Sequence, residues 1–237
     1  ICMGHRFTII GVKAIKYSEL QLHEGLDDLV FMKGYPKPKK NRWPKGHTMI
    51  YRNRVSVRPL DVHFDGHNYT VRIFAPSSPE DYQLALSLIH ALVTIGGGKI
   101  KPENSHEIGL ATFKGQYNTA WAKTHSLKSF RNLLDAFHET KVPIKMNGPK
   151  AEIELGPRMI EHLNKNEATM AGNFFERFRL LNYMDEEKLC QPSLLSLKSK
   201  NHGISVSLAE FREGLPTVFN TSTDLIGLKS TTNQTKG

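Results

Sequence analysis

Hydrophobic and polar positions alternate along the first third of the chain in patterns typical of β-strands. A short apolar run predicts a strand at residues 6–12, and alternation predicts another at residues 54–58. Two alternating runs at residues 61–74 are separated by Asp65-Gly66, a common two-residue turn. We therefore expect residues 61–74 to form a β-hairpin.

The strongest helical pattern lies at residues 77–100, where apolar residues recur every three or four positions. Ser78 is expected to cap this helix, and Pro79 suits the first helical position because its missing N–H is not needed there. Asp81, three residues after the cap, reinforces the start. The glycines at 96–98 are expected to end the helix.

Weaker patterns predict the remaining elements. These are helices at residues 18–32, 126–140 and 167–184, a short helix starting at Pro157, a hairpin at 142–155, and late strands at 204–211 and 215–219 that would close the sheet.

Hairpins and helices follow one another without regular alternation, which is typical of the α+β class. We expect a mainly antiparallel sheet with two or more amphipathic helices packed on one face, chiefly those at 78–95 and 126–140. A single domain is predicted over residues 1–220. Residues 221–237 are rich in Ser, Thr, Asn and Lys, and are predicted to form a flexible tail.

The positive charge is concentrated in one stretch of the chain. The sequence has 32 Lys and Arg, 23 Asp and Glu, and a net charge of +9. No acid lies between Asp28 and Asp61, whereas nine cations do. The other 23 Lys and Arg equal the 23 Asp and Glu in number, so the rest of the chain has no net charge. Most of these cations fall at residues 33–47, called the basic loop below, where three prolines forbid a continuous helix. Such a local excess steers anionic partners.

The candidate binding residues are the cations of this stretch and its aromatic residues Tyr35 and Trp43. The full set is Lys33, Tyr35, Lys37, Lys39, Lys40, Arg42, Trp43, Lys45, Arg52, Arg54 and Arg58. The cations suit an acidic protein surface. They also suit nucleic acid, because cations neutralise phosphates and aromatic rings stack on bases. A solvated basic loop without a partner is the remaining interpretation.

Other candidate chemistry is weaker. His63, Asp65 and His67 are metal-ligating residue types, but they also form the predicted turn, and no second cluster supplies further ligands. The glycines at 96–98 follow a helix, whereas a phosphate-binding loop precedes one. No nucleophile, kinase or metalloprotease motif is present. We therefore assign no catalytic residue, metal or cofactor.

Cysteine content and hydropathy bear on the compartment. With only Cys2 and Cys190, a disulfide framework is not expected. No run of 18 apolar residues occurs, so no membrane partner is expected. A cytoplasmic location fits both observations.

Several segments together resemble an uncharacterised bacterial domain-of-unknown-function family found in cytosolic proteins. The resemblance rests on "RNRVSVR", "YTVRIFAPSSPEDYQLALSLIHALVTIGGGKI", "IELGPRMIEHL" and "SLAEFREGLPTVF", and covers about residues 50–220. It implies a cytosolic α+β domain and carries over no functional residue. The basic loop is not a feature of that resemblance.

The leading hypothesis is a non-catalytic, accessory or immunity-like interaction protein that docks an acidic partner surface through the basic loop. The alternative is a nucleic-acid-binding protein that uses the same loop. A third hypothesis is an enzyme whose active site is assembled from distant residues.

Overall fold

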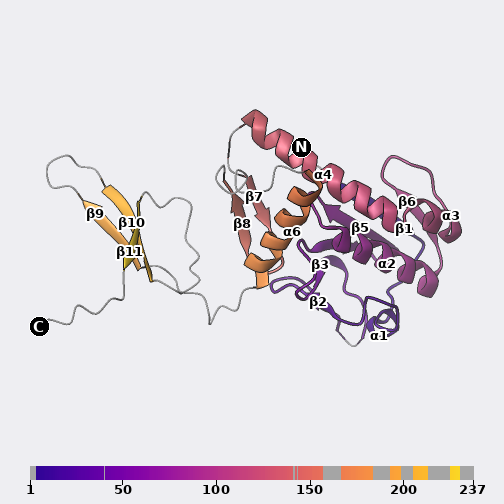
Figure 1. Ribbon diagram of the computed structural model, residues 1–237. Helices are drawn as coiled ribbons and strands as arrows, with labels where there is room; N and C mark the ends of the chain where they lie inside the picture. The colour runs from indigo at the N-terminus through magenta and orange to yellow at the C-terminus, as the bar shows by residue number, and fades with distance from the viewer. Residues whose placement is uncertain are drawn as a thin grey trace, which may run out of the picture. The chain divides into compact units, whose positions relative to one another are not determined.

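An antiparallel sheet of six strands organises the N-terminal part of the chain, in the order β2-β3-β4-β5-β1-β6 (Figure 1). The structure, a computed structural model, describes residues 4–39, 41–140, 142, 144–156, 167–183, 193–198, 205–212 and 225–229. The elements follow in chain order as β1 (Gly4–Ile10), α1 (Tyr17–Leu20), β2 (Leu29–Phe31), β3 (Gly46–Arg52), β4 (Leu60–Phe64), β5 (Asn68–Phe74), α2 (Pro79–Gly96), β6 (Lys99–Pro102), α3 (Leu110–Gln116), α4 (Thr119–Thr140), β7 (Ile144–Asn147), β8 (Glu152–Leu155), α6 (Glu167–Tyr183), β9 (Ser193–Lys198), β10 (Ser205–Arg212) and β11 (Leu225–Lys229).

Residue contacts divide the chain into two units, Ile1–Tyr183 and Met184–Gly237. The second unit contains a separate sheet in the order β11-β10-β9, in which β10 pairs antiparallel with β9 and parallel with β11. The predicted strand at 204–211 is therefore confirmed as β10, but it does not close the six-stranded sheet. The single domain over residues 1–220 and the tail after it stay predictions. The residue contacts place a boundary between two units after Tyr183, and strand β11 lies at Leu225–Lys229.

Helix α2 starts where every local signal favours it. The Ser78 hydroxyl accepts a hydrogen bond from the Asp81 backbone N–H, and the Asp81 carboxylate accepts one from the Ser78 backbone N–H. This reciprocal pair satisfies two N–H groups that a helix start leaves without partners, and Pro79 needs no partner. The predicted helix is thus confirmed, with its cap.

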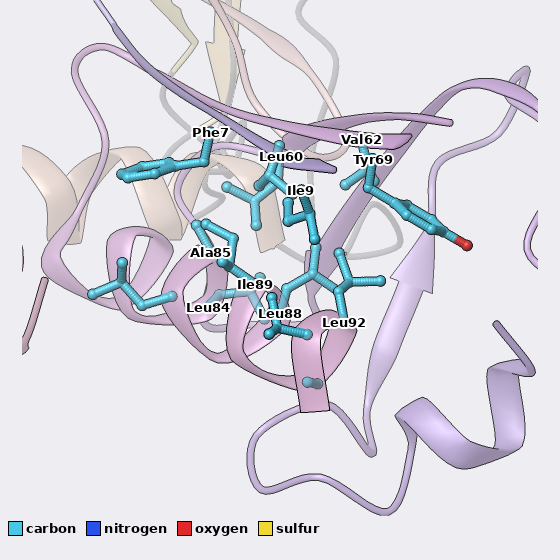
Figure 2. Packing of buried hydrophobic residues seen from close by; sticks show 14 of the residues in the cluster. Phe7, Ile9, Leu60, Val62, Tyr69, Leu84, Ala85, Leu88, Ile89 and Leu92 are labelled. Carbon is cyan, nitrogen blue, oxygen red and sulfur yellow. The ribbon is translucent and has the colours of Figure 1, made fainter. Parts of the chain in front are cut away.

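The principal core lies between α2 and one face of the sheet. Side chains of β1, β4 and β5 share this core with α2, and Figure 2 shows Ile9 and Leu60 between the strands and the helix. Helix α2 supplies Leu84, Ala85, Leu88, Ile89 and Leu92, all buried. Because α2 is buried over much of its circumference, it is a central helix rather than a half-exposed one.

A second cluster of apolar residues lies between α4, the β7–β8 hairpin and α6 (Figure 1). Its aromatic centre consists of Phe130 from α4 with Phe174 and Phe178 from α6, and the Phe130 and Phe174 rings are 5.0 Å apart. The predicted helices at 126–140 and 167–184 and the hairpin at 142–155 are confirmed. Helix α4 begins seven residues before its predicted start.

Two predicted elements are wrong because tertiary contacts override the local pattern. The helix expected at residues 18–32 is limited to α1, and the chain then turns at Gly25, whose φ is +77°. Residues Leu29–Phe31 pair with β3 as an edge strand instead. The consecutive apolar residues there suit a strand better than one face of a helix.

The strand expected at residues 54–58 is a turn, and the strand lies earlier, at β3. Arg54 has a left-handed φ of 58°, and the Ser56 N–H donates to the Arg52 carbonyl. The N–H groups of Val57 and Arg58 donate to Asp81, so they are unavailable to a neighbouring strand.

The α+β class and the mainly antiparallel sheet are confirmed. The predicted helix at Pro157 and the predicted strand at 215–219 lie outside the described residues. Within the residues that are described, no helix is both long and apolar enough to cross a membrane.

Candidate partner-binding surface

The basic loop is held to the rest of the protein at its C-terminal half. Asn41 accepts a hydrogen bond from the Ser18 N–H at 2.8 Å and donates one to the Ser18 hydroxyl at 2.6 Å. The Tyr17 N–H donates to the Asn41 carbonyl, and the Trp43 N–H donates to the Ile15 carbonyl. The loop therefore has a defined course at these points.

The structure leaves five predicted cations of the loop exposed: Lys33, Lys37, Lys39, Arg42 and Lys45. Tyr35 is 40% exposed. Lys40 lies outside the described residues. None of the five exposed cations has an ion-pair partner among the residues that the structure describes.

The backbone gathers some of these cations at a tight turn. The Arg42 N–H donates to the Lys39 carbonyl at 3.1 Å, and Arg42 also forms an isolated backbone bridge with Lys16. Lys16 is exposed and was missed by the sequence analysis, because 26 positions separate it from Arg42. Its ammonium pairs with Glu19 at 3.3 Å, which offsets its charge.

Trp43 belongs to the core rather than to the surface. Its side chain is 3% exposed, and its ring lies 5.6 Å from that of Phe31 and 6.1 Å from that of Tyr69. The sequence predicts that Trp43 stacks on a base. This prediction is wrong, because the buried ring is not available to a ligand. Its physical role is to anchor the loop, because burying a large aromatic side chain is strongly favourable.

Arg58 is likewise buried, at 8% exposure. Its guanidinium donates to the Ala75 carbonyl at 3.1 Å and lies 5.3 Å from the centre of the Phe74 ring. Burial lowers the pKa of Arg58 to about 10, while Asp81 opposes that shift. Burial also raises the pKa of Asp81 to about 6. This pair holds the turn after β3 against the start of α2, and Arg58 presents little to a partner.

Arg52 is the last residue of β3 and Arg54 lies just after it, so both are at the end of the strand opposite the basic loop. A strand of this length spans roughly 20 Å. Arg52 forms an ion pair with Asp28 at 2.8 Å, whereas Arg54 is exposed in the turn. The cations of residues 33–58 therefore form two groups, and the larger exposed group is the basic loop.

Asp65, the carboxylate among the candidate metal ligands at residues 63–67, is held by hydrogen bonds of its own turn. The Asp65 carboxylate accepts hydrogen bonds from the Asn68 side chain and from the backbone N–H groups of His67 and Asn68. These bonds, the Asn68 side chain foremost, lower the pKa of Asp65 to about 2. Among the described residues, no group of three or more His, Cys, Asp or Glu side chains is placed to hold a metal.

Two hollows were not predicted from the sequence. The larger, of about 590 Å³, lies beside the outer side of α2 and includes His23, His90 and Lys114. Burial, followed by Lys114 and His23, lowers the pKa of His90. The charged residues that line this larger hollow have mixed signs. Two of them form ion pairs: Glu80 with Arg179, and Arg52 with Asp28.

The smaller hollow, of about 370 Å³, lies on the sheet face opposite α2. Its seven lining residues are Arg6, Thr8, His47, Asp61, His63, Thr70 and Arg72. The signal for this site was present in the sequence, because polar residues alternate with buried ones along β1, β4 and β5. Finding it required the register of four strands.

A family model described as "Domain of unknown function (DUF4299)" matches residues 6–193. This confirms the resemblance to a domain-of-unknown-function family. The match starts earlier than the expected residue 50, so it includes the basic loop and most of β1. No curated protein and no solved structure matches the chain.

Proposed function

Because the chain belongs to the DUF4299 family, whose description assigns no activity, we propose a function from its own surface: it is a binding protein that docks an acidic surface of a protein partner through the basic loop. The observation that carries the proposal is the group of five exposed loop cations without ion-pair partners among the described residues. Such a group offers a positive potential to an approaching acidic surface.

The anchoring of the loop supports docking. Asn41 and Trp43 fix two points of the loop, at the surface and in the core respectively. A partner that binds a loop already held in place loses less conformational entropy than one that must order a free chain. The three prolines limit the backbone freedom of the same loop.

The burial of Trp43 favours a protein partner over nucleic acid. Proteins that bind single strands combine cations with exposed aromatic rings on which bases stack. Of the two loop aromatics, only Tyr35 is substantially exposed. The loop therefore offers charge with little stacking surface.

The test compares two variants that remove the same charge. One carries Lys37→Ala and Lys39→Ala in the basic loop, and the control carries Lys114→Ala and Lys123→Ala on exposed positions elsewhere. Partners are recovered with the full chain from nuclease-treated extract of the native cells, and the dominant acidic protein is purified for affinity measurements at several salt concentrations. An exposed charge pair contributes up to about 1 kcal/mol. The loop variant should thus bind up to roughly thirtyfold more weakly, and the control should match the wild type.

Equal affinity of the loop variant and the wild type would exclude the basic loop as the docking surface. Loss of all partners on nuclease treatment, together with salt-sensitive binding of random oligonucleotides, would replace the proposal with nucleic-acid binding.

A further inference from the structure

One face of the six-stranded sheet is buried against α2, and the opposite face carries polar, exposed or half-buried residues along β1, β4 and β5. On β5, Tyr69, Val71 and Ile73 are buried against the α2 side, whereas Thr70 and Arg72 alternate with them and are only half-buried. The same alternation places Arg6 and Thr8 of β1 on the face opposite α2. The polar residues of this face are not part of the principal core.

The strand register aligns these polar residues in two rows that cross the sheet. In the first row, His47, His63, Thr70, Thr8 and Lys101 are successive partners on β3, β4, β5, β1 and β6. In the second row, Met49, Asp61, Arg72 and Arg6 are successive partners on β3, β4, β5 and β1. Directly opposite side chains of antiparallel strands start about 5 Å apart. The two rows therefore bring guanidinium, hydroxyl and imidazole groups together in the hollow of about 370 Å³.

Arg6 and Arg72 are directly opposite one another on β1 and β5, so the register places two guanidinium-bearing side chains side by side. Like charges directly opposite one another destabilise a sheet. Asp61 faces Arg72, and one Asp61 oxygen is 2.9 Å from the His47 ring nitrogen. Arg72 also lies 4.9 Å from the centre of the Phe74 ring. With Lys101 at the end of the neighbouring row, cations outnumber the single carboxylate that lines the hollow.

We propose that this hollow binds the phosphate group of a small phosphorylated molecule. The guanidinium groups of Arg6 and Arg72 supply forked donors that match phosphate oxygens. The hydroxyls of Thr8 and Thr70, adjacent to them in the other row, supply further donors for the same group. The volume is within the range of small-molecule sites, and all seven lining residues are polar, which suits a strongly hydrophilic ligand.

A strand of nucleic acid fits this hollow less well than a small molecule. Proteins that bind single strands on an open sheet stack bases on aromatic side chains. The lining residues of the hollow include no Phe, Tyr or Trp. The arginine and threonine side chains of the hollow suit recognition of one phosphate group instead.

The test is calorimetric titration of the full chain with inorganic pyrophosphate, for which we expect a dissociation constant of about 1 mM or tighter. Arg6→Gln should weaken this affinity at least tenfold, and Thr70→Val should weaken it severalfold. Arg177→Gln removes the same charge from an exposed position on α6 and should leave the affinity unchanged. Because Arg6→Gln also removes a like-charge contact, the variant should unfold at the same temperature as the wild type or above it, which separates loss of binding from loss of folding.

The proposal is overturned if pyrophosphate does not bind, or if Arg6→Gln and Arg177→Gln bind it equally well. Citrate binding as tightly as pyrophosphate would assign the hollow to carboxylates instead. Binding of oligothymidylate without binding of pyrophosphate would assign the face to nucleic acid. Binding of pyrophosphate that is lost in Arg6→Gln and kept in the variant with Lys37→Ala and Lys39→Ala would establish the hollow independently of the basic loop.

Discussion

Replacing Trp43 with alanine tests whether this residue anchors the basic loop from within the core. The side chain is 3% exposed and lies among Phe31 and Tyr69. An aromatic side chain of this kind buries roughly 150–250 Å², worth about 4–6 kcal/mol at about 25 cal/mol per Å². Truncations of buried tryptophan to alanine cost roughly 3–5 kcal/mol, and we expect a loss of unfolding free energy in this range.

Trp43→Phe should be much milder than Trp43→Ala. The buried Trp43 Nε1 has no hydrogen-bond partner among the described residues, so removing it also removes an unsatisfied polar group. Phenylalanine keeps most of the apolar contact, and we expect a loss below about 1.5 kcal/mol. Tyr35→Ala is the matched control within the same loop, because Tyr35 is 40% exposed and should change stability by no more than about 0.5 kcal/mol.

The assay is urea unfolding followed by far-ultraviolet circular dichroism for the wild type and the three variants. A second measurement uses the fact that the chain has only two tryptophans, Trp43 and Trp121. In a Trp121→Phe background, fluorescence reports Trp43 alone, and acrylamide should quench it weakly. The reasoning is refuted if Trp43→Ala and Tyr35→Ala cost the same, or if the Trp43 fluorescence is quenched as readily as that of free tryptophan.

Two further predictions concern α2 and its ends. Burial raises the pKa of Asp81 from 3.8 to about 6, because the folded protein favours the neutral carboxyl group over the charged one. The contribution of this shift to the free energy of unfolding is therefore full below about pH 4 and is lost as the pH rises through 6. The stability difference between the wild type and Asp81→Asn should therefore favour the wild type more at about pH 4 than at about pH 7, by up to about 3 kcal/mol in urea unfolding, and equal differences would contradict this. Gly97 and Gly98 both have positive φ, but only at Gly98 would a Cβ meet the Ile10 carbonyl and Val12. Gly97→Ala should lower the free energy of unfolding by about 1–2 kcal/mol, and Gly98→Ala by at least about 1 kcal/mol more, as measured by thermal unfolding. The reverse order would show that the close approach at Gly98 is unimportant.

Elements that the sequence predicts well are those in which local chemistry decides the outcome. Ser78, Pro79 and Asp81 specify the start of α2 within four residues, and Asp65-Gly66 specifies the turn of its hairpin. The two wrong elements depend on distant partners. Residues 29–31 become a strand because β3 pairs with them. Residues 54–58 do not form a strand because the N–H groups of Val57 and Arg58 donate to Asp81.

The same distinction applies to the candidate sites. Exposure of Lys37 and Lys39 follows from a proline-rich, polar loop, which the sequence shows directly. The burial of Trp43 depends on Tyr69, which lies 26 positions later, so it is not visible in the local pattern. The pairing of Arg6 with Arg72 joins residues 66 positions apart, and only the register of β1 and β5 shows it.

The placement of β1 between β5 and β6 also bears on how the protein acquires its structure. This strand is the first to be synthesised of the three, yet both of its neighbours follow it by about sixty residues or more. Until those neighbours emerge from the ribosome, its pairing edges have no native complement. Pairing of β1 into the sheet is thus a late, long-range event, and a nascent chain halted before residue 68 should expose β1 to chaperones and proteases.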